Sequence, residues 1–518
     1  MTGRSIRRLA LAAVMVVAAT VGFVVQQSQA NAVSAVPAPT ASAPTVYAGT
    51  LIQQRADSQI MKHTDGYYYF TGTVPEYDRI VLRRAKTLTG LASAPETVIW
   101  RHHATGEMAN HIWAPELHFI NGKWYVYFAA GRASDSWDIR MYVLEGTGAN
   151  PLTTTWTEKG AIHTGIADEK FALDASTFVD EYDGRKTRYL IWTQRPPAEV
   201  ANPTNTSIYI AKMGAHPWEI TGTPVLISAP TYDWEIQRYR VNEGPTVLQR
   251  NGRTFLTYSA SATDTRYCLG MLTAGKGADL LDPKSWAKSP DPVFKSDAAT
   301  GQYGPGHNSF VVAEDGKTDI LVYHDRDYSF KDEDRSALDD VNRRTRIQPF
   351  TWNADGTPNF GVPVADPAPV KLRMHASPEL SVRHYEYRAR LDTAVSPAED
   401  GQFRLVPGLA EGGTVSLESA NFPHYYLRDD NGEAWVRDAT SHEDFVTGAS
   451  FFLRRGLSGS GVSFEAIGYP AGRYLHRGPD NLLYFDKITS AADKAQATFD
   501  FDPAPAALPA GNPAPRSP

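Results

Sequence analysis

The chain has 518 residues, of which 42% are hydrophobic and 21% charged, and its formal net charge is −7. That charge argues against a nucleic acid as partner. The one cysteine, Cys268, excludes an intrachain disulfide, so the fold must be stabilised by its core.

The first 30 residues are predicted to be a secretory signal. Arg4, Arg7 and Arg8 precede an apolar run that ends in small residues at Ala30. No second hydrophobic stretch of spanning length follows, so we expect a secreted protein without a membrane span; an uncleaved anchor is the alternative. Residues 504–518 are rich in Pro and Ala, which predicts a disordered tail.

Five segments share one pattern, an Asn-Gly or Asp-Gly turn beside aromatic strands, which is typical of β-hairpins. Their turn glycines are spaced by 56, 62, 68 and 64 residues, which suits units of about four strands. We therefore predict a five-bladed β-propeller, because radial closure protects the sheet edges. Two stacked sandwiches are the alternative, but they do not explain a fivefold spacing. The segments are 64–72, 120–130, 182–194, 250–260 and 314–324.

One residue in each unit stands nine or ten positions before the turn glycine. The strand that enters such a hairpin lines the channel of a propeller, so we expect these side chains to surround one axis. Carboxylates brought together destabilise a fold unless something binds there or their pKa values separate. The pattern therefore predicts a functional site. The residues are Asp57, Trp113, Asp174, Glu243 and His307.

Paired carboxylates that flank a sugar are the usual machinery of glycoside hydrolysis, one as acid and the other as base or nucleophile. A third carboxylate beside the acid can raise its pKa and orient it. Trp113 offers an aromatic wall for the apolar face of a sugar ring. For His307 two interpretations stay open, a hydrogen-bonded channel histidine and a ligand of an ion or water.

The segment from about 46 to 368 resembles glycoside hydrolase family 43. The resemblance implies an inverting enzyme in which Asp57 is the general base, Asp174 the pKa modulator and Glu243 the general acid. Ser58 departs from the family, where Pro more commonly follows the base. His307 would help to hold an ion, often calcium, while the chemistry requires no cofactor. The motifs are RADSQI (55–60), HIWAPELHFINGKWYVYFAA (111–130), FALDASTFVD (171–180), RVNEGPTVL (240–248) and GPGHNSFV (304–311).

The finer resemblance is to exo-acting α-L-arabinofuranosidases of that family. It is carried by WTQRPP (192–197), with Trp192 and Gln194, and by RRTRIQPFTWNADGTP (343–358), where we expect Arg346 near the sugar. For Arg346 a surface charge in a basic run is the alternative.

This resemblance implies release of terminal L-arabinofuranose from α-1,5-linked arabinan by a monomer that needs no membrane. Two other functions stay open. One is a β-xylosidase or arabinoxylan-debranching hydrolase with the same triad. The other is a non-catalytic arabinan-binding protein.

A second repeat follows a Pro-rich link. Segments 413–431 and 460–481 align, with Ser416 and Ser463 47 residues apart, and 381–392 looks like part of a first copy. Three copies of about 45 strand-and-turn residues predict a β-trefoil over 377–503, separate from the propeller at 46–368.

These copies resemble carbohydrate-binding module family 42, which binds arabinofuranose through a pocket with a histidine and an aspartate. The first copy has both, as His384 and Asp400. The second has Asp429 and Gly448 instead, which predicts a dead pocket. The third has His476 but Gln496 in place of the aspartate, which predicts a weakened one. A purely structural trefoil is the alternative.

Overall fold

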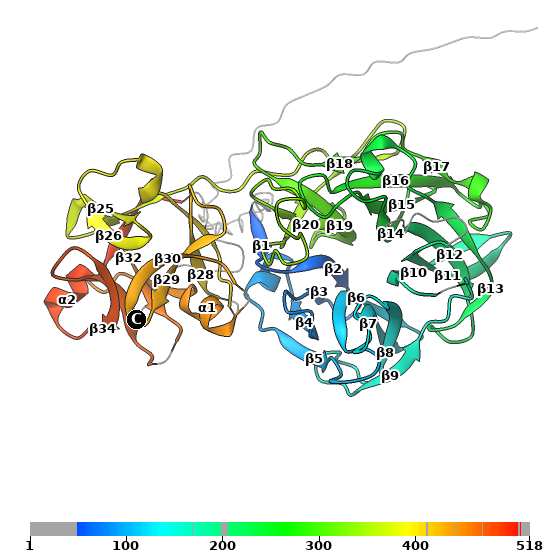
Figure 1. The fold of residues 1–518 in the computed structure, drawn as a ribbon, viewed down its shortest axis with the longest axis horizontal. Helices are drawn as coiled ribbons and strands as arrows, with labels where there is room; N and C mark the ends of the chain where they lie inside the picture. Colours follow the sequence, from blue (N-terminus) through cyan, green and yellow to red (C-terminus); the bar gives the residue numbers. More distant parts are fainter. Residues whose placement is uncertain are drawn as a thin grey trace, which may run out of the picture. The chain divides into compact units, whose positions relative to one another are not determined.

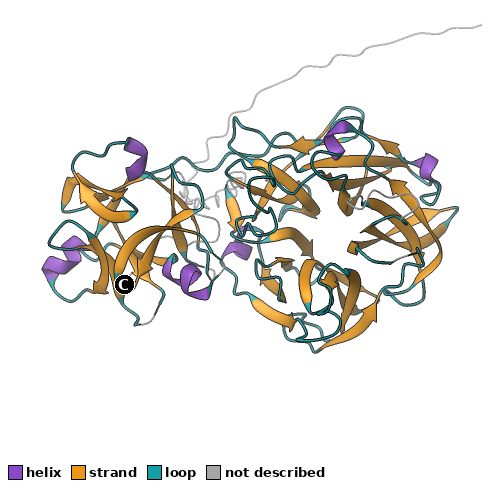
Figure 2. Cartoon of the chain, in the orientation of Figure 1, coloured by secondary structure: helices purple, strands orange, loops and turns teal. Residues whose placement is uncertain are grey.

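The computed structural model describes residues 49–505 and 508, apart from 168, 198–205, 411–412, 441 and 469. The predicted signal at 1–30 lies outside the described residues, as does most of the tail predicted at 504–518. Strands dominate the described part, which also has two short α-helices and four 3₁₀ turns (Figure 2). Over these residues no helix is both long and apolar enough to cross a membrane.

Five antiparallel sheets of the described chain stand around one axis as the blades of a propeller (Figure 1). This confirms the predicted propeller. Blades one to three are β2 (Ala56–Lys62), β3 (Tyr68–Thr73), β4 (Arg79–Ala85) and β5 (Thr97–Arg101); β6 (Asn110–Ile120), β7 (Lys123–Gly131), β8 (Arg140–Gly146) and β9 (Trp156–Ala161); and β10 (Ala172–Tyr182), β11 (Arg185–Gln194), β12 (Ser207–Met213) and β13 (Ile220–Ser228). Blade four is β14 (Asn242–Arg250), β15 (Arg253–Ala260), β16 (Cys268–Gly275), β17 (Ala287–Lys288) and β18 (Phe294–Lys295).

The fifth blade combines both ends of the propeller segment. It contains β19 (Tyr303–Val312), β20 (Asp319–Arg326) and β21 (Arg344–Pro349), and its outer edge is β1 (Thr50–Ile52), which pairs with β21. Leu51 and Ile52 are 2% exposed and pack in one core cluster with Val322 and Ile347. The first described strand therefore closes the ring. A two-stranded ribbon follows, β22 (Thr351–Trp352) and β23 (Pro358–Asn359).

The predicted hairpin turns connect the first two strands of each blade. In the Asn121-Gly122 turn both central residues have positive φ, 50° and 83°, as a type I′ turn requires. The Asn251-Gly252 turn has the same conformation. The Asp183-Gly184 turn shares it, whereas at Gly66 and Gly316 only the glycine of the pair has positive φ. The Asn-Gly and Asp-Gly pairs identified the start of each blade because such turns are determined locally.

The strands after residue 370 form a separate closed sheet. Nine of the described strands pair in a ring, in the order β26-β25-β24-β35-β32-β31-β28-β29-β30, and pairing of β26 with β30 closes it. Leu417, Leu427 and Phe464 are 0% exposed within its core. The elements are β24 (Lys371–Met374), β25 (Ser377–Tyr385), β26 (Arg388–Asp392), β27 (Phe403–Pro407), β28 (Val415–Ser419), β29 (Tyr425–Asp430), β30 (Glu433–Asp438), α1 (Glu443–Gly448), β31 (Phe451–Arg455), β32 (Val462–Ala466), β33 (Arg473–Arg477), β34 (Leu483–Lys487), α2 (Ala491–Gln496) and β35 (Phe499–Asp502).

Closure of the ring by β1 makes a stability prediction. Leu51→Ala should lower the stability of the propeller by about 2–5 kcal/mol, because it leaves a cavity between β1 and the rest of blade five. Thermal melting followed by circular dichroism measures the effect. The control is Val98→Ala, whose side chain is 40% exposed on β5; equal melting temperatures of the two variants would contradict the role of β1.

Candidate active site

The five residues predicted from the hairpin spacing line one cavity of about 560 Å³. Each stands near the start of the innermost strand of its blade, in β2, β6, β10, β14 and β19. The structure therefore brings together residues that are up to 250 positions apart in the sequence. They are Asp57, Trp113, Asp174, Glu243 and His307.

A β-bulge interrupts the inner strand of every blade at this level, where the pairing register shifts. The residue with positive φ is the site residue itself at Asp57, Asp174 and His307, with φ of 50°, 57° and 43°, and the following residue at Ala114 and Gly244. A bulge redirects a side chain out of the strand's regular alternation. Left-handed residues other than glycine each cost about 1–3 kcal/mol, and such strain gathers at functional sites.

Asp57 is surrounded by groups that favour its ionised form. The Thr73 hydroxyl donates to Oδ2 at 2.6 Å, and both Arg343 Nη1 and His307 Nδ1 lie 3.3 Å from Oδ1. The backbone N–H donates to His324 Nδ1 at 3.0 Å. Burial alone would raise the pKa of Asp57, but Arg343, followed by the two histidines, holds that pKa well below its ordinary value. Asp57 is therefore a carboxylate in the folded protein.

Glu243 has the opposite surroundings. Burial, and then the negative charge of Asp174, raise the pKa of Glu243 to about 7. The Tyr267 hydroxyl donates to Oε1 at 2.7 Å, which leaves Oε2 free to carry a proton. Glu243 therefore gains and loses its proton near neutral pH, as a general acid requires.

Asp174 is tied to the backbone next to Glu243. Its Oδ2 accepts the Gly244 N–H at 2.9 Å and the Thr193 hydroxyl at 3.2 Å. Burial raises the pKa of Asp174, and the nearby His307 opposes that rise. The pKa values of Asp174 and Glu243 separate, because ionising one carboxyl group makes it costly to ionise the other.

His307 sits between the carboxylates. Burial would lower its pKa, but Asp57, Asp174 and then Glu243 raise the pKa above the ordinary value. An imidazolium there balances part of the negative charge. Its backbone N–H donates to the Ser259 hydroxyl at 2.7 Å.

The calcium ion expected beside His307 stays a prediction. Calcium takes six to eight oxygen ligands. Among the described residues no three His, Cys, Asp or Glu side chains group so as to hold a metal ion.

The position expected for Arg346 is wrong. Arg346 is 1% exposed in β21, the third strand from the axis, where it lies 3.3 Å from Asp325 and 2.5 Å from Asp366. Arg343, which precedes β21, lines the cavity instead. A run of four charged and polar residues does not indicate which one faces the axis, because that depends on where the strand begins.

Trp192 and Gln194 do not line the cavity either. Both are 0% exposed in β11, the second strand of blade three, and the indole N–H of Trp192 donates to Gln194 Oε1 at 2.9 Å. Trp192 packs in a core cluster with Leu190. Arg195, which follows Gln194 in the chain, lines the cavity instead.

Several residues around the cavity were missed by the sequence analysis. Tyr267, Trp137 and Arg343 come from connections between strands, where no periodicity marks them. One signal was present: Gly306 precedes His307, and a Cβ there would lie 2.1 Å from the Tyr267 ring. The glycine therefore makes room for the tyrosine that binds Glu243.

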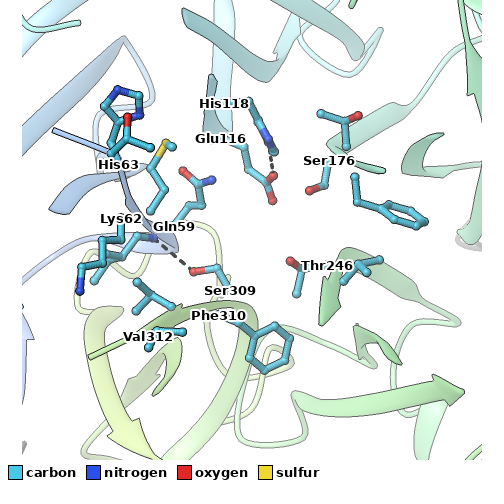
Figure 3. A pocket seen from close by; sticks show the side chains of 17 residues that line it. Gln59, Lys62, His63, Glu116, His118, Ser176, Thr246, Ser309, Phe310 and Val312 are labelled. Atoms are coloured by element: carbon cyan, nitrogen blue, oxygen red, sulfur yellow. Dashed lines mark hydrogen bonds and ion pairs between the residues drawn. The ribbon is translucent and has the colours of Figure 1, made fainter. Parts of the chain in front are cut away.

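A second cavity, of about 540 Å³, lies further along the same inner strands (Figure 3). Side chains of Glu116, Ser176, Thr246 and Ser309 surround it. Its one acidic residue, Glu116, is paired with His118 at 2.9 Å. Without a second carboxylate, this cavity does not offer the acid and base that the first one does.

In the C-terminal sheet the structure brings His384 and Asp400 together, with Nε2 3.6 Å from Oδ1. Asn421 bridges them: its Nδ2 donates to Asp400 Oδ1 at 2.8 Å and its Oδ1 lies 3.1 Å from His384 Nε2. Arg383 binds the other oxygen of Asp400. In the second copy Gly448 stands beside Arg428, whose buried Nε has no partner.

The expected equivalence of His476 with His384 is wrong. Val382 pairs with Leu391 in the first copy, and Leu475 pairs with Phe485 at the same place in the third. His476 therefore takes the position of Arg383, and Arg477 takes that of His384. His476 Nε2 lies 3.1 Å from Asp486. The order of arginine and histidine is thus reversed between the first copy, Arg383-His384, and the third, His476-Arg477. Only the strand register shows which position each residue occupies.

Comparison with known families gives two matches. The model described as "Glycosyl hydrolases family 43" matches residues 49–358, and the "Alpha-L-arabinofuranosidase B (ABFB) domain" matches residues 370–501.

Similar proteins cover most of the chain. An "Extracellular exo-alpha-(1->5)-L-arabinofuranosidase" of Streptomyces avermitilis is 56% identical over 89% of this chain and 93% of its own length. An "Alpha-L-arabinofuranosidase 43" of Humicola insolens is 51% identical over 89% and 95%. The crystal structure of an α-L-arabinofuranosidase from Lactobacillus brevis is 53% identical, with a TM-score of 0.57, and covers 62% of this chain and 97% of its own.

The bulge after Glu243 makes a prediction about backbone and packing. Gly244 has φ of +57°, and a Cβ there would lie 3.0 Å from the His307 ring, whereas Gly252 has φ of +70° with nothing within 4 Å. Alanine at either position should cost about 1–2 kcal/mol because of the left-handed backbone. Gly244→Ala should cost more, since it also displaces His307. Thermal melting of both variants measures the difference, and equal losses would contradict the tight contact.

Proposed function

The chain belongs to glycosyl hydrolase family 43, and we propose that it is a secreted enzyme that releases terminal L-arabinofuranose, one unit at a time, from α-1,5-linked arabinan and arabino-oligosaccharides. The observation that carries the proposal is the likeness, at 56% identity over 89% of the chain, to a protein named as an extracellular exo-acting arabinofuranosidase. The predicted signal at residues 1–30 agrees with secretion.

The mechanism is the inverting one of the family, and the environments of the carboxyl groups support the base and the acid that it requires. Asp57 is the general base, since its carboxylate stays ionised and can take a proton from water. Glu243 is the general acid and gives the proton on Oε2 to the leaving oxygen, because Oε1 is engaged by Tyr267. Asp174 raises the pKa of Glu243 and holds the backbone beside it.

The sugar ring that is cleaved off lies at the cavity floor between these carboxyl groups. Trp113 supports it, since this indole lines the cavity and is 8% exposed. Arg343 lines the same cavity and keeps Asp57 ionised. In an inverting enzyme the water and the leaving oxygen stand on opposite faces of the sugar ring.

The C-terminal strands form a β-trefoil that binds arabinofuranose on the substrate. The support is a threefold order: β24–β27, β28–β31 and β32–β35 each have four strands, with a helical turn (Ala398–Gly401, α1 or α2) before the last. One complete pocket, with His384 and Asp400, is present. The propeller extends over 46–368, and the C-terminal domain begins with β24 at Lys371, before the predicted position 377, and ends by 503. The protein works as a monomer.

Hydrolysis tests the proposal directly. Wild-type protein should release arabinose one unit at a time from α-1,5-arabino-oligosaccharides, and Glu243→Gln should lower the rate by about 100-fold or more, because the leaving oxygen loses its proton donor. Chromatography over time measures the products. Release of xylose from β-1,4-xylo-oligosaccharides in place of arabinose would favour a β-xylosidase, and binding of arabinan without turnover would favour a binding protein.

The pKa values predict the pH profile. Glu243 acts while protonated, so kcat/KM should fall as pH rises through about 7, the pKa of its carboxyl. Asp57 acts while ionised, and because its pKa is lowered, kcat/KM should stay high to below about pH 4, the ordinary pKa of an aspartate. Asp174→Asn removes a charge that raises the pKa of Glu243, so the fall should move to lower pH. A fall that stays in place or moves upward would contradict the role of Asp174.

A further inference from the structure

A second set of residues stands behind the bulges, on the second strand of each blade. In every blade the residue with positive φ directly follows one that pairs with this strand. The pairing partner therefore occupies the same place in all five blades. The five partners are Thr73, Ala129, Thr193, Ser259 and His324, opposite Ala56, Trp113, Leu173, Glu243 and Gly306.

Hydroxyl groups of this set bind the N–H groups that the bulges release from strand pairing. The Thr73 hydroxyl accepts the N–H of Ala114 in the next blade at 2.7 Å. The Ser259 hydroxyl accepts the N–H of His307 in the next blade, also at 2.7 Å. At His324 the place of the small hydroxyl is taken by an imidazole.

His324 makes the corresponding bond to the general base. Its Nδ1 accepts the N–H of Asp57 at 3.0 Å and lies 3.5 Å from Oδ1 of the same residue. Burial, and then the charge of Arg343, hold the pKa of His324 well below its ordinary value, so the ring is neutral and its proton is on Nε2. The bond fixes the left-handed backbone through which Asp57 turns toward the axis.

The same imidazole packs against the tyrosine that binds the general acid. Tyr267 stacks on His324, with ring centroids 5.7 Å apart and planes at 7°. Tyr267 is 1% exposed and also lies close against Gly306. Its ring therefore keeps its place, with the hydroxyl on Glu243, as long as His324 keeps its own.

Stability alone does not explain a histidine at this position. The His324 side chain is 0% exposed, and its Nε2 makes no hydrogen bond to any residue that the structure describes. A buried donor without a partner destabilises a fold, and a phenyl ring of nearly the same shape would not carry one. The described residues that line the catalytic cavity do not include His324, so it does not act by touching the sugar.

Resting on the proposed function, the geometry points to His324 as a positioning residue for the general base and the general acid together. Its Nδ1 holds the backbone of Asp57, and its ring holds Tyr267 and, through it, Glu243. In an inverting enzyme the two carboxyl groups must leave room for a water beside the sugar. A shift of about 1 Å in such a group can slow the reaction about 100-fold.

Two variants separate the two contacts. His324→Phe keeps a ring against Tyr267 but loses the acceptor for the N–H of Asp57. His324→Asn keeps an oxygen near the position of Nδ1 but loses the ring. Two substrates separate the acid from the base: α-1,5-arabinobiose needs a proton on its leaving oxygen, whereas the phenolate of 4-nitrophenyl α-L-arabinofuranoside leaves without one.

The two variants should differ in which substrate they affect. His324→Phe should lower kcat by about 10-fold or more on both substrates, because both need the base. His324→Asn should lower kcat by about 10-fold or more on arabinobiose and by less than about 2-fold on the nitrophenyl glycoside, because only the first needs the acid. KM should change by less than about 2-fold, since His324 does not reach the substrate.

A matched control makes the same substitution elsewhere. His63→Phe lies just beyond the far end of β2, where the ring packs against Phe119 and Trp124, and it should leave both substrates unaffected. Melting curves establish that each variant is folded, and His324→Gln serves as a second variant without a ring if the smaller amide unfolds the protein.

The remaining outcomes would overturn the proposal. Equal losses of both His324 variants on both substrates would mean that the residue serves only general packing. An unchanged kcat in His324→Phe would mean that the bond to Asp57 is not needed. A wild-type protein that releases arabinose from neither substrate would contradict the proposed function instead.

Discussion

The site depends on one backbone feature, a β-bulge in the inner strand of each blade at the same distance along the axis. In a regular strand successive side chains point to alternate faces of the sheet, toward neighbouring blades. The bulge redirects one residue toward the axis, and in Asp57, Asp174 and His307 that residue adopts the left-handed conformation itself. Five packed blades can sustain this strain because each is held on both sides, and β1 supplies the last contact of the ring.

The carboxyl groups that the bulges bring together differ in protonation because their neighbours differ. Asp57 lies within 3.3 Å of a guanidinium, so its ionised form is favoured. Glu243 has no cation of that kind, is desolvated and shares its surroundings with the charge of Asp174, so its protonated form is favoured. Two like side chains therefore take opposite roles, which is the general way that one site holds both an acid and a base.

The remaining contacts determine which oxygen of Glu243 carries the proton, and they shape the cavity. Tyr267 binds one oxygen of Glu243, and Gly306 leaves the space that the tyrosine ring occupies. On the rim, the loop of residues 132–139 holds Trp137 toward the cavity. These groups come from strand connections rather than from inner strands, so the scaffold provides the catalytic carboxyl groups and the connections shape what surrounds them.

The sequence by itself determined the propeller and the ring of five site residues, because hairpin turns are local and their spacing repeats. It also predicts a reduced second pocket, where Gly448 stands in place of a carboxylate. Tertiary structure alone decided which arginine faces the cavity, since Arg343 and Arg346 differ only in their place relative to the start of β21. In the same way it placed Trp192 and Gln194 in the core and exchanged the positions of His476 and Arg477. Strand starts and pairing register depend on contacts with distant segments, and no local pattern encodes them.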